Sequence, residues 1–278
     1  MTEPRPDHFF VAEGDAFIPT RAAHGYWQAN TLSGAAAASL LGFVIERDFC
    51  APDWVPVRLS IDMVRMPPAA PLTVITEVLH ESGRLRLVEA RLIADGRLQT
   101  RALCQIVRKG TQPDNPVWQS PGWPAPHPDT LPAQAHWRWD MRPIPADHPR
   151  FNRASPPGGG GQGNPPVLGQ LAPAAARQAW LKVGMEVVAG HPLSPFLMLV
   201  TTADFASPLT HSSESGIDFV NTDFTIHLHR QPQGEWLGYE LTGHSSANGV
   251  AVGQAAIHDI AGPLGVIVVS AIANSRRK

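Results

Sequence analysis

The amino-acid sequence predicts an α+β protein made of two copies of one unit, in which a helix is followed by an antiparallel sheet. Three observations lead to this prediction: the same order of helix and strands occurs twice, turn residues recur at a constant offset, and a proline-rich stretch separates the copies. The chain has 278 residues, of which 43% are hydrophobic, so it is long and apolar enough to bury a sizeable core.

The first copy, residues 1–110, begins with a predicted helix from Asn30 to Glu46. Its apolar side chains recur at helical spacing, and a run of alanines gives it high helix propensity. Four strand-like stretches follow, separated by turn residues: Val57–Arg65, Leu72–His80, Leu85–Ile93 and Leu98–Val107. The sequence therefore predicts a helix and then an antiparallel meander.

The second copy, residues 175–278, repeats this order. It has a strand near 179–188, a helix from Pro195 to Ala206, and strands near 219–230, 235–244, 250–258 and 266–272. Arg65-Met66-Pro67 corresponds to Arg230-Gln231-Pro232 at an offset of 165 residues, and matching glycine and aspartate residues keep that offset to within one residue. Such a repeat indicates tandem domains or a fused dimer, and we favour the fused dimer because pairing the two sheets side by side removes unpaired edges.

Residues 111–174 are predicted to form a connector between the copies. They contain more than half of the 28 prolines and the glycine run Gly158–Gly161. The large apolar rings in this stretch should nevertheless pack onto a folded surface. They are those of Trp118, Trp123, Trp137 and Trp139.

Composition and charge exclude several classes of function. The formal net charge of -2 leaves no basic surplus to neutralise a phosphate backbone, so nucleic acid is not expected as a partner. Cys50 and Cys104 are too few for a disulfide framework and are expected to be buried thiols in a reducing compartment. The longest apolar run, Leu264–Ile272, is far short of the ~20 residues that cross a bilayer. We therefore expect a cytoplasmic protein that does not bind membranes.

Several short segments make nearly the whole chain resemble one known family. They are Gly25-Tyr26-Trp27, Leu32-Ser33-Gly34-Ala35-Ala36, Val57 to Pro67, Thr202-Ala203-Asp204-Phe205, Asn221 to Arg230 and Gly234-Glu235-Trp236. In this order they resemble the double-hotdog acyl-CoA thioesterases, of the acyl-CoA thioesterase II type. The resemblance implies a double hotdog, with two antiparallel sheets each wrapped around a central helix. It also implies a cofactor-free hydrolase of fatty acid metabolism that cleaves an acyl thioester, such as an acyl-CoA, to a free acid and a thiol.

The resemblance gives catalytic roles to two residues of the second copy. In this family an aspartate on the second helix acts as base or nucleophile, and Asp204 stands at that position. Because Asp204 follows an otherwise apolar helix, its carboxylate should be partly buried and should need hydrogen-bond partners. The alternative is that Asp204 only ends the helix. Asn221 falls where the family has a hydroxyl or amide that assists the aspartate, although asparagine before a strand is also a common turn residue.

The last strand departs from the family pattern. Val269-Ser270 stand where the family has a glutamine followed by serine, and a valine side chain cannot position a water molecule. Either Ser270 or another polar group substitutes, or the protein binds acyl thioesters without cleaving them well. The alternative function is thus a non-catalytic acyl-thioester binding protein. Val269, Ser270 and Thr202 are expected to border the pocket in the second copy.

The first copy offers a weaker candidate. Its helix-start segment, from His24 to Gly34, could form a pseudo-symmetric second site or border the first one, but a degenerate half is the favoured interpretation. A hotdog-type enoyl hydratase, in which an aspartate and a histidine lie five positions apart, is not supported because no aspartate of this chain has a histidine at that offset.

Two other motifs are interpreted as structural. The pair His227 and His229 shares one strand face with Asp223, but a solvated face is favoured there and no metal is expected. Arg65 and Arg230 could meet a coenzyme A phosphate, although surface salt bridges are the default interpretation. Exposed sheet faces are compatible with a homodimer.

Overall fold

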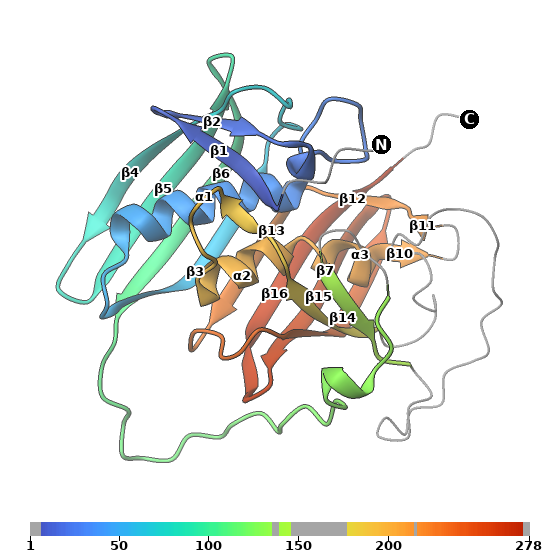
Figure 1. Cartoon of the computed structure of the whole chain (residues 1–278). Coiled ribbons are helices and arrows are strands. Elements are labelled where there is room, and N and C mark those ends of the chain that lie inside the picture. The colour runs from blue at the N-terminus through green and yellow to red at the C-terminus, as the bar shows by residue number, and fades with distance from the viewer. Residues whose placement is uncertain (1–6, 135–138, 146–176, 214–215, 275–278) are drawn as a thin grey trace.

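The computed structural model describes residues 7–134, 139–145, 177–213 and 216–274 (Figure 1). Its main feature is an 11-stranded sheet. The strand order is β4-β5-β6-β3-β13-β16-β15-β14-β8-β7, and the eleventh strand, β12, pairs with β16. A small sheet β2-β1-β9 lies beside it. The first-copy elements are β1 (His8–Glu13), β2 (Ala16–Pro19), α1 (Gly34–Phe49), β3 (Trp54–Met63), β4 (Thr73–Glu81), β5 (Leu85–Ala94) and β6 (Arg97–Arg108).

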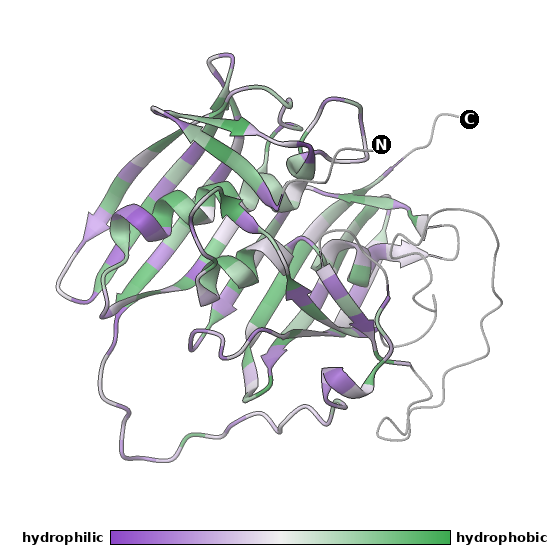
Figure 2. Cartoon of the chain, in the orientation of Figure 1, coloured by the Kyte–Doolittle hydropathy of each residue, from purple (hydrophilic) through white to green (hydrophobic). Residues whose placement is uncertain are grey.

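The remaining elements include α2 and β13 to β16, which repeat the helix and the meander of the first copy. They are β7 (Trp139–Pro143), β8 (Gln178–Val183), β9 (Glu186–Val188), α2 (Pro195–Ala203), α3 (Ala206–His211), β10 (Ser212–Ser213), β11 (Gly216–Ile217), β12 (Phe219–Asn221), β13 (Asp223–Leu228), β14 (Leu237–Ala247), β15 (Val250–Asp259) and β16 (Gly262–Ala273). Hydrophobic and hydrophilic residues alternate along many strands (Figure 2), as expected where one face of a sheet covers a core.

Pairing of β3 with β13 joins the two copies. Thr225 stands opposite Ser60 in this antiparallel pair, and its Oγ1 donates a hydrogen bond to Ser60 Oγ at 3.1 Å. These two residues are separated by the repeat offset of 165 residues, so equivalent positions meet at a local two-fold axis. The two sheets are thus paired side by side, as the fused-dimer interpretation expects, and they form one continuous sheet instead of two separate ones.

The helices α1 and α2 cross closely because small side chains line their contact. A Cβ atom built on Gly42 would lie 3.2 Å from Val200 Cγ1. Nearby, Ser39 Oγ donates a hydrogen bond to Thr201 Oγ1 at 3.1 Å, and both side chains are fully buried. The contact between the helices is therefore filled with protein atoms.

The predicted helix Pro195–Ala206 is two helices, α2 and α3, with a break at Asp204 and Phe205. Pro208 explains the break, because proline has no N–H to donate to the carbonyl of residue 204 and its ring crowds that carbonyl. The N–H of Ser207 instead donates to Asp204 O at 3.2 Å. The break leaves Asp204 at the C-terminal end of α2.

The stretch predicted as a connector contributes to the fold. Strand β7 lies within it and pairs with β8 through the register Trp139 to Val183. Trp123 packs over the outer face of the main sheet, where its ring stacks on His258 at a centroid distance of 4.4 Å. Trp118 is exposed, whereas Trp137 and Gly158–Gly161 fall outside the described residues.

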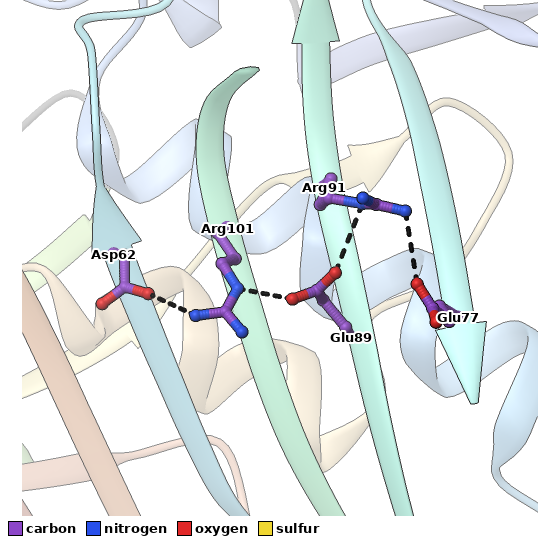
Figure 3. Close-up of polar contacts among 5 residues, drawn as sticks. All are labelled: Asp62, Glu77, Glu89, Arg91 and Arg101. Atoms are coloured by element: carbon purple, nitrogen blue, oxygen red, sulfur yellow. Dashed lines mark hydrogen bonds and ion pairs between the residues drawn. The ribbon is translucent and has the colours of Figure 1, made fainter. Parts of the chain in front are cut away.

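A charged network crosses the outer face of the first-copy sheet (Figure 3). Arg101 on β6 contacts Asp62 of β3 at 3.4 Å and Glu89 of β5 at 2.5 Å. Arg91 contacts Glu89 at 3.3 Å and Glu77 of β4 at 3.5 Å. Glu89 is buried, so it depends on these two guanidinium groups for its polar partners. The network ties four strands together by side-chain contacts.

Both cysteines carry free thiols, but only Cys104 is fully buried, and Cys50 is half-buried. Burial raises the pKa of the Cys50 thiol to about 12, with nearby Glu46 adding to the effect. Such a thiol is protonated at neutral pH and is a poor nucleophile. In the described part of the chain, no helix combines the length and apolarity needed to cross a membrane.

Candidate active site

Asp204 is held between the two copies of the repeat. Its Oδ1 accepts a hydrogen bond from Asn221 Nδ2 of the second copy at 2.9 Å. Its Oδ2 accepts a hydrogen bond from the Ala35 N–H of the first copy at 3.1 Å. The carboxylate therefore lies at the N-terminus of α1, where the helix dipole favours a negative charge. A site expected mainly in the second copy is in fact shared by both.

Gly34 makes room for this contact. A Cβ atom on Gly34 would lie 2.9 Å from Asp204 Oδ2 and 2.9 Å from Met63 Cε. Any larger residue would therefore push the carboxylate away from the helix N-terminus.

The first turn of α1 presents one further backbone donor. Ala36 N–H donates to the Oγ of Ser33, the N-cap residue, and Ala37 N–H donates to Ser33 O. Ala35 N–H is occupied by Asp204, whereas Gly34 N–H makes no hydrogen bond to another residue in the described ranges. A helix N-terminus with such a donor is suited to bind a developing oxyanion.

Asn221 supports the carboxylate from β12. The residue pairs with Ala271 on β16, which fixes its position in the sheet. Its Nδ2 donates to Asp204 and also lies 3.3 Å from Met63 Sδ. This arrangement leaves the amide oxygen of Asn221 as an acceptor for a water molecule or a substrate group.

A pocket of about 390 Å³, partly open to solvent, lies beside this pair. It is lined by Tyr26, Trp27, Trp139, Asp204, Phe205, Ser207, Pro208, Ile217 and Asn221. The aromatic rings provide apolar walls, and the carboxylate and amide provide the polar groups. Such a combination is typical of a small-molecule site.

The other residues considered from the sequence lie around this pocket but do not line it. Thr202 is buried, and its Oγ1 is hydrogen-bonded to Tyr239 OH at 2.8 Å. Val269 is buried in the core on the inward face of β16, two residues from the Ala271 that pairs with Asn221. The Ser270 N–H donates to Asp223 Oδ1 at 2.7 Å. His24 forms an isolated bridge with Leu32 just before α1.

Sequence reasoning did not identify most of the pocket walls. Trp139, Ser207, Pro208 and Ile217 have no motif that marks them, because they come together only through the pairing of β7 and the break after α2. Tyr26, Trp27 and Phe205 lie within segments that resemble the family, and this was the available signal.

The remaining charged candidates do not contribute to the pocket. Arg230 donates two hydrogen bonds to Asp259, at 2.6 and 2.7 Å, and Arg65 donates to Leu98 O at 2.8 Å. Both arginines thus fasten a strand end to the neighbouring hairpin. Within the described residues, no group of three or more histidine, cysteine, aspartate or glutamate side chains could hold a metal ion.

A second carboxylate meets a helix N-terminus at the other end of the helix pair. Glu46, near the end of α1, lies 2.6 Å from the Oγ of Ser194, the N-cap residue of α2. Burial raises the pKa of Glu46, and the hydrogen bond from Ser194 offsets only part of this effect. This contact mirrors that of Asp204 with α1.

Replacing Glu46 with glutamine is expected to stabilise the protein at neutral pH by less than about 1 kcal/mol, because it removes a desolvated charge and keeps a hydrogen-bonding group. A raised pKa in the folded state favours folding at low pH, and this contribution is lost as the pH rises through that pKa. The difference from the parent should therefore be present at pH 7 and vanish near pH 4. Urea unfolding at the two pH values measures this difference in the free energy of unfolding. An equal difference at both pH values would show that the pKa of Glu46 is not raised in the folded protein.

The fold and the pocket together define a hotdog-fold protein with a carboxylate site between its two halves. The model of the acyl-CoA thioesterase N-terminal domain matches residues 23–108, and the model of the C-terminal domain matches residues 119–268. The chain therefore belongs to the acyl-CoA thioesterase family, and the resemblance found in the sequence is confirmed.

Similar solved structures support the fold. The acyl-CoA thioesterase II TesB2 from Mycobacterium marinum has a TM-score of 0.62 and 17% identity, covering 90% of this chain and 95% of that chain. The tesB protein of Mycobacterium avium subs paratuberculosis has a TM-score of 0.64 and 15% identity, covering 95% of each chain. A hot dog fold protein from Alicyclobacillus acidocaldarius has a TM-score of 0.67 and 13% identity, covering 96% of each chain. No curated protein matches the sequence.

Proposed function

We propose that this protein is an acyl-CoA thioesterase that hydrolyses an acyl thioester to a free acid and a thiol in the Asp204 pocket. The observation that supports this most is the position of the Asp204 carboxylate. It is fixed by Asn221 and by the Ala35 N–H, and it borders a pocket with aromatic walls that is partly open to solvent. Membership of the acyl-CoA thioesterase family supports the same reaction class.

In the proposed mechanism, Asp204 acts as the general base for a water molecule. The carboxylate takes one proton from water while the water oxygen bonds to the thioester carbonyl carbon, and the carbonyl oxygen becomes an oxyanion. Collapse of this intermediate breaks the carbon–sulfur bond, and the proton held by Asp204 passes to the leaving thiolate. Direct attack by the carboxylate, followed by hydrolysis of the anhydride, gives the same products.

Two groups are proposed to assist Asp204. The Gly34 N–H, at the positive end of the α1 dipole, stabilises the oxyanion. Asn221 orients the carboxylate through its Nδ2 and the water through its amide oxygen. Because Val269 supplies no amide from the last strand, the water is positioned by fewer groups, and we expect slow turnover.

Release of free thiol from short-, medium- and long-chain acyl-CoAs tests this proposal. We expect weak but measurable hydrolysis, because losing one accessory group typically costs about 10²-fold rather than all activity. Val269→Gln should increase the rate, since an amide there would lie close to Asn221. An absence of thiol release from every acyl-CoA, with binding still seen in calorimetry, would contradict hydrolysis and favour a binding protein.

A further inference from the structure

The floor of the Asp204 pocket is a layer of packed aromatic rings. Phe205 is fully buried, and its ring meets that of Trp139 edge to face at a centroid distance of 5.9 Å. Behind them, Phe205 packs edge to face on Tyr239 at 5.7 Å. The Tyr239 hydroxyl is hydrogen-bonded to Thr202, and burial raises its pKa, so it stays protonated. The floor is thus fixed by packing and by a buried hydrogen bond.

The direction along the two helices is also closed. An acyl chain that continued between α1 and α2 would have to separate Gly42 from Val200, where even an added methyl group would lie 3.2 Å from the valine. It would also have to break the contact of Ser39 with Thr201. Close-packed interiors of this kind do not open for a chain without a large cost.

The space that remains is small. The volume of about 390 Å³ includes space that is open to solvent, so the part enclosed by the protein is smaller than this value. Tyr26 and Trp27 lie at its mouth, with ring centroids 6.4 Å apart and exposed fractions of 55% and 41%. The mouth and the floor are therefore both aromatic, and the space between them is short.

We propose that the pocket selects compact acyl groups, short-chain or aromatic, and that Trp139 is the residue that sets this limit. The inference rests on the proposed thioesterase site. Trp139 belongs to β7, which pairing with β8 holds against the pocket, so the stretch between the two copies supplies the specificity-determining wall. A flat acyl group can stack on the rings, whereas a long chain meets the floor.

The inference can be tested without turnover by calorimetric binding of ketone analogues of acyl-CoA. In these analogues a methylene separates the sulfur from the carbonyl, so there is no thioester bond to hydrolyse. The probes are acetonyl-CoA, phenacyl-CoA and 2-oxoheptadecyl-CoA, the last below its micelle concentration. In an open tunnel each buried methylene would add about fourfold in affinity. We instead expect phenacyl-CoA to bind the parent at least about 10-fold more tightly than the long-chain probe. Equal or tighter binding of the long-chain probe would overturn the proposal.

Substitution of Trp139 makes the test specific. Trp139→Leu should improve long-chain binding about 10-fold, and Trp139→Phe should give a smaller change in the same direction if the leucine variant unfolds. Trp180→Leu is the matched control, because Trp180 is equally buried on the neighbouring strand β8 but faces away from this pocket. If the affinity depends on acyl-chain length in the same way in the Trp139 variants and in the control, Trp139 does not set the limit.

Thiol release separates this inference from the proposed function. If the parent hydrolyses long-chain acyl-CoAs best, the limit on chain length is wrong and the thioesterase function stands. If no acyl-CoA is cleaved while the analogues keep the expected order of affinity, the function is wrong and the pocket still selects compact groups.

Discussion

Asp204→Asn is expected to lower the rate of thiol release from acyl-CoA by about three orders of magnitude or more. The amide has the same shape as the carboxylate and can still accept the Ala35 hydrogen bond. It cannot, however, take a proton from water or attack a carbonyl carbon. Steady-state kinetics with the best substrate of the parent measures the effect.

Glu46→Gln is the matched control for this experiment. It makes the same chemical change at the mirrored contact, where Glu46 meets the N-terminus of α2. Its kcat should stay close to that of the parent. Equal losses in the two variants, or full activity of Asp204→Asn, would show that Asp204 is not the catalytic group.

Gly34→Ala is expected to lower kcat by about 10²-fold although alanine is the better helix former. The added methyl group would lie 2.9 Å from Asp204 Oδ2, so the carboxylate must move away from Ala35 and Asn221. Because the substitution keeps every charged group, the loss would come from position alone. Kinetics together with thermal unfolding distinguishes this effect from unfolding.

Gly42→Ala provides the comparison on the same helix. Its methyl group would contact Val200, which lies in the helix pair and outside the pocket. This variant should lose some stability and keep its kcat. If Gly34→Ala remained fully active, the close approach of the carboxylate to the helix would have no catalytic importance.

Much of the fold could be predicted because its information is local. Alternating apolar residues and turn residues predict β3 to β6 closely, and the constant offset predicts their partners in the second copy. The pairings of β1 with β9 and of β7 with β8 were missed because they join distant segments of the chain. The break between α2 and α3 was missed because Pro208 lies beyond the end of the predicted helix.

The site was only partly accessible to sequence reasoning. Asp204 and Asn221 were selected by their resemblance to the family, and the structure brings them within 2.9 Å of each other. The contact with Ala35 could not be foreseen, since a backbone N–H has no residue signature. Gly34 was selected for a second site in the first copy or for the border of the first site, and it lies against Asp204 of the second copy.

The pairing of β3 with β13 has a consequence for how the protein unfolds. Neither copy can open without exposing an edge of the other, and the Asp204 contact with α1 is lost in the same event. The copies should therefore melt together in one transition, despite their origin as a repeat. A cut in the exposed stretch near Gly110 would then leave two fragments that remain bound to each other. The cut removes only the covalent link between the copies, whereas the hydrogen bonds between β3 and β13 remain.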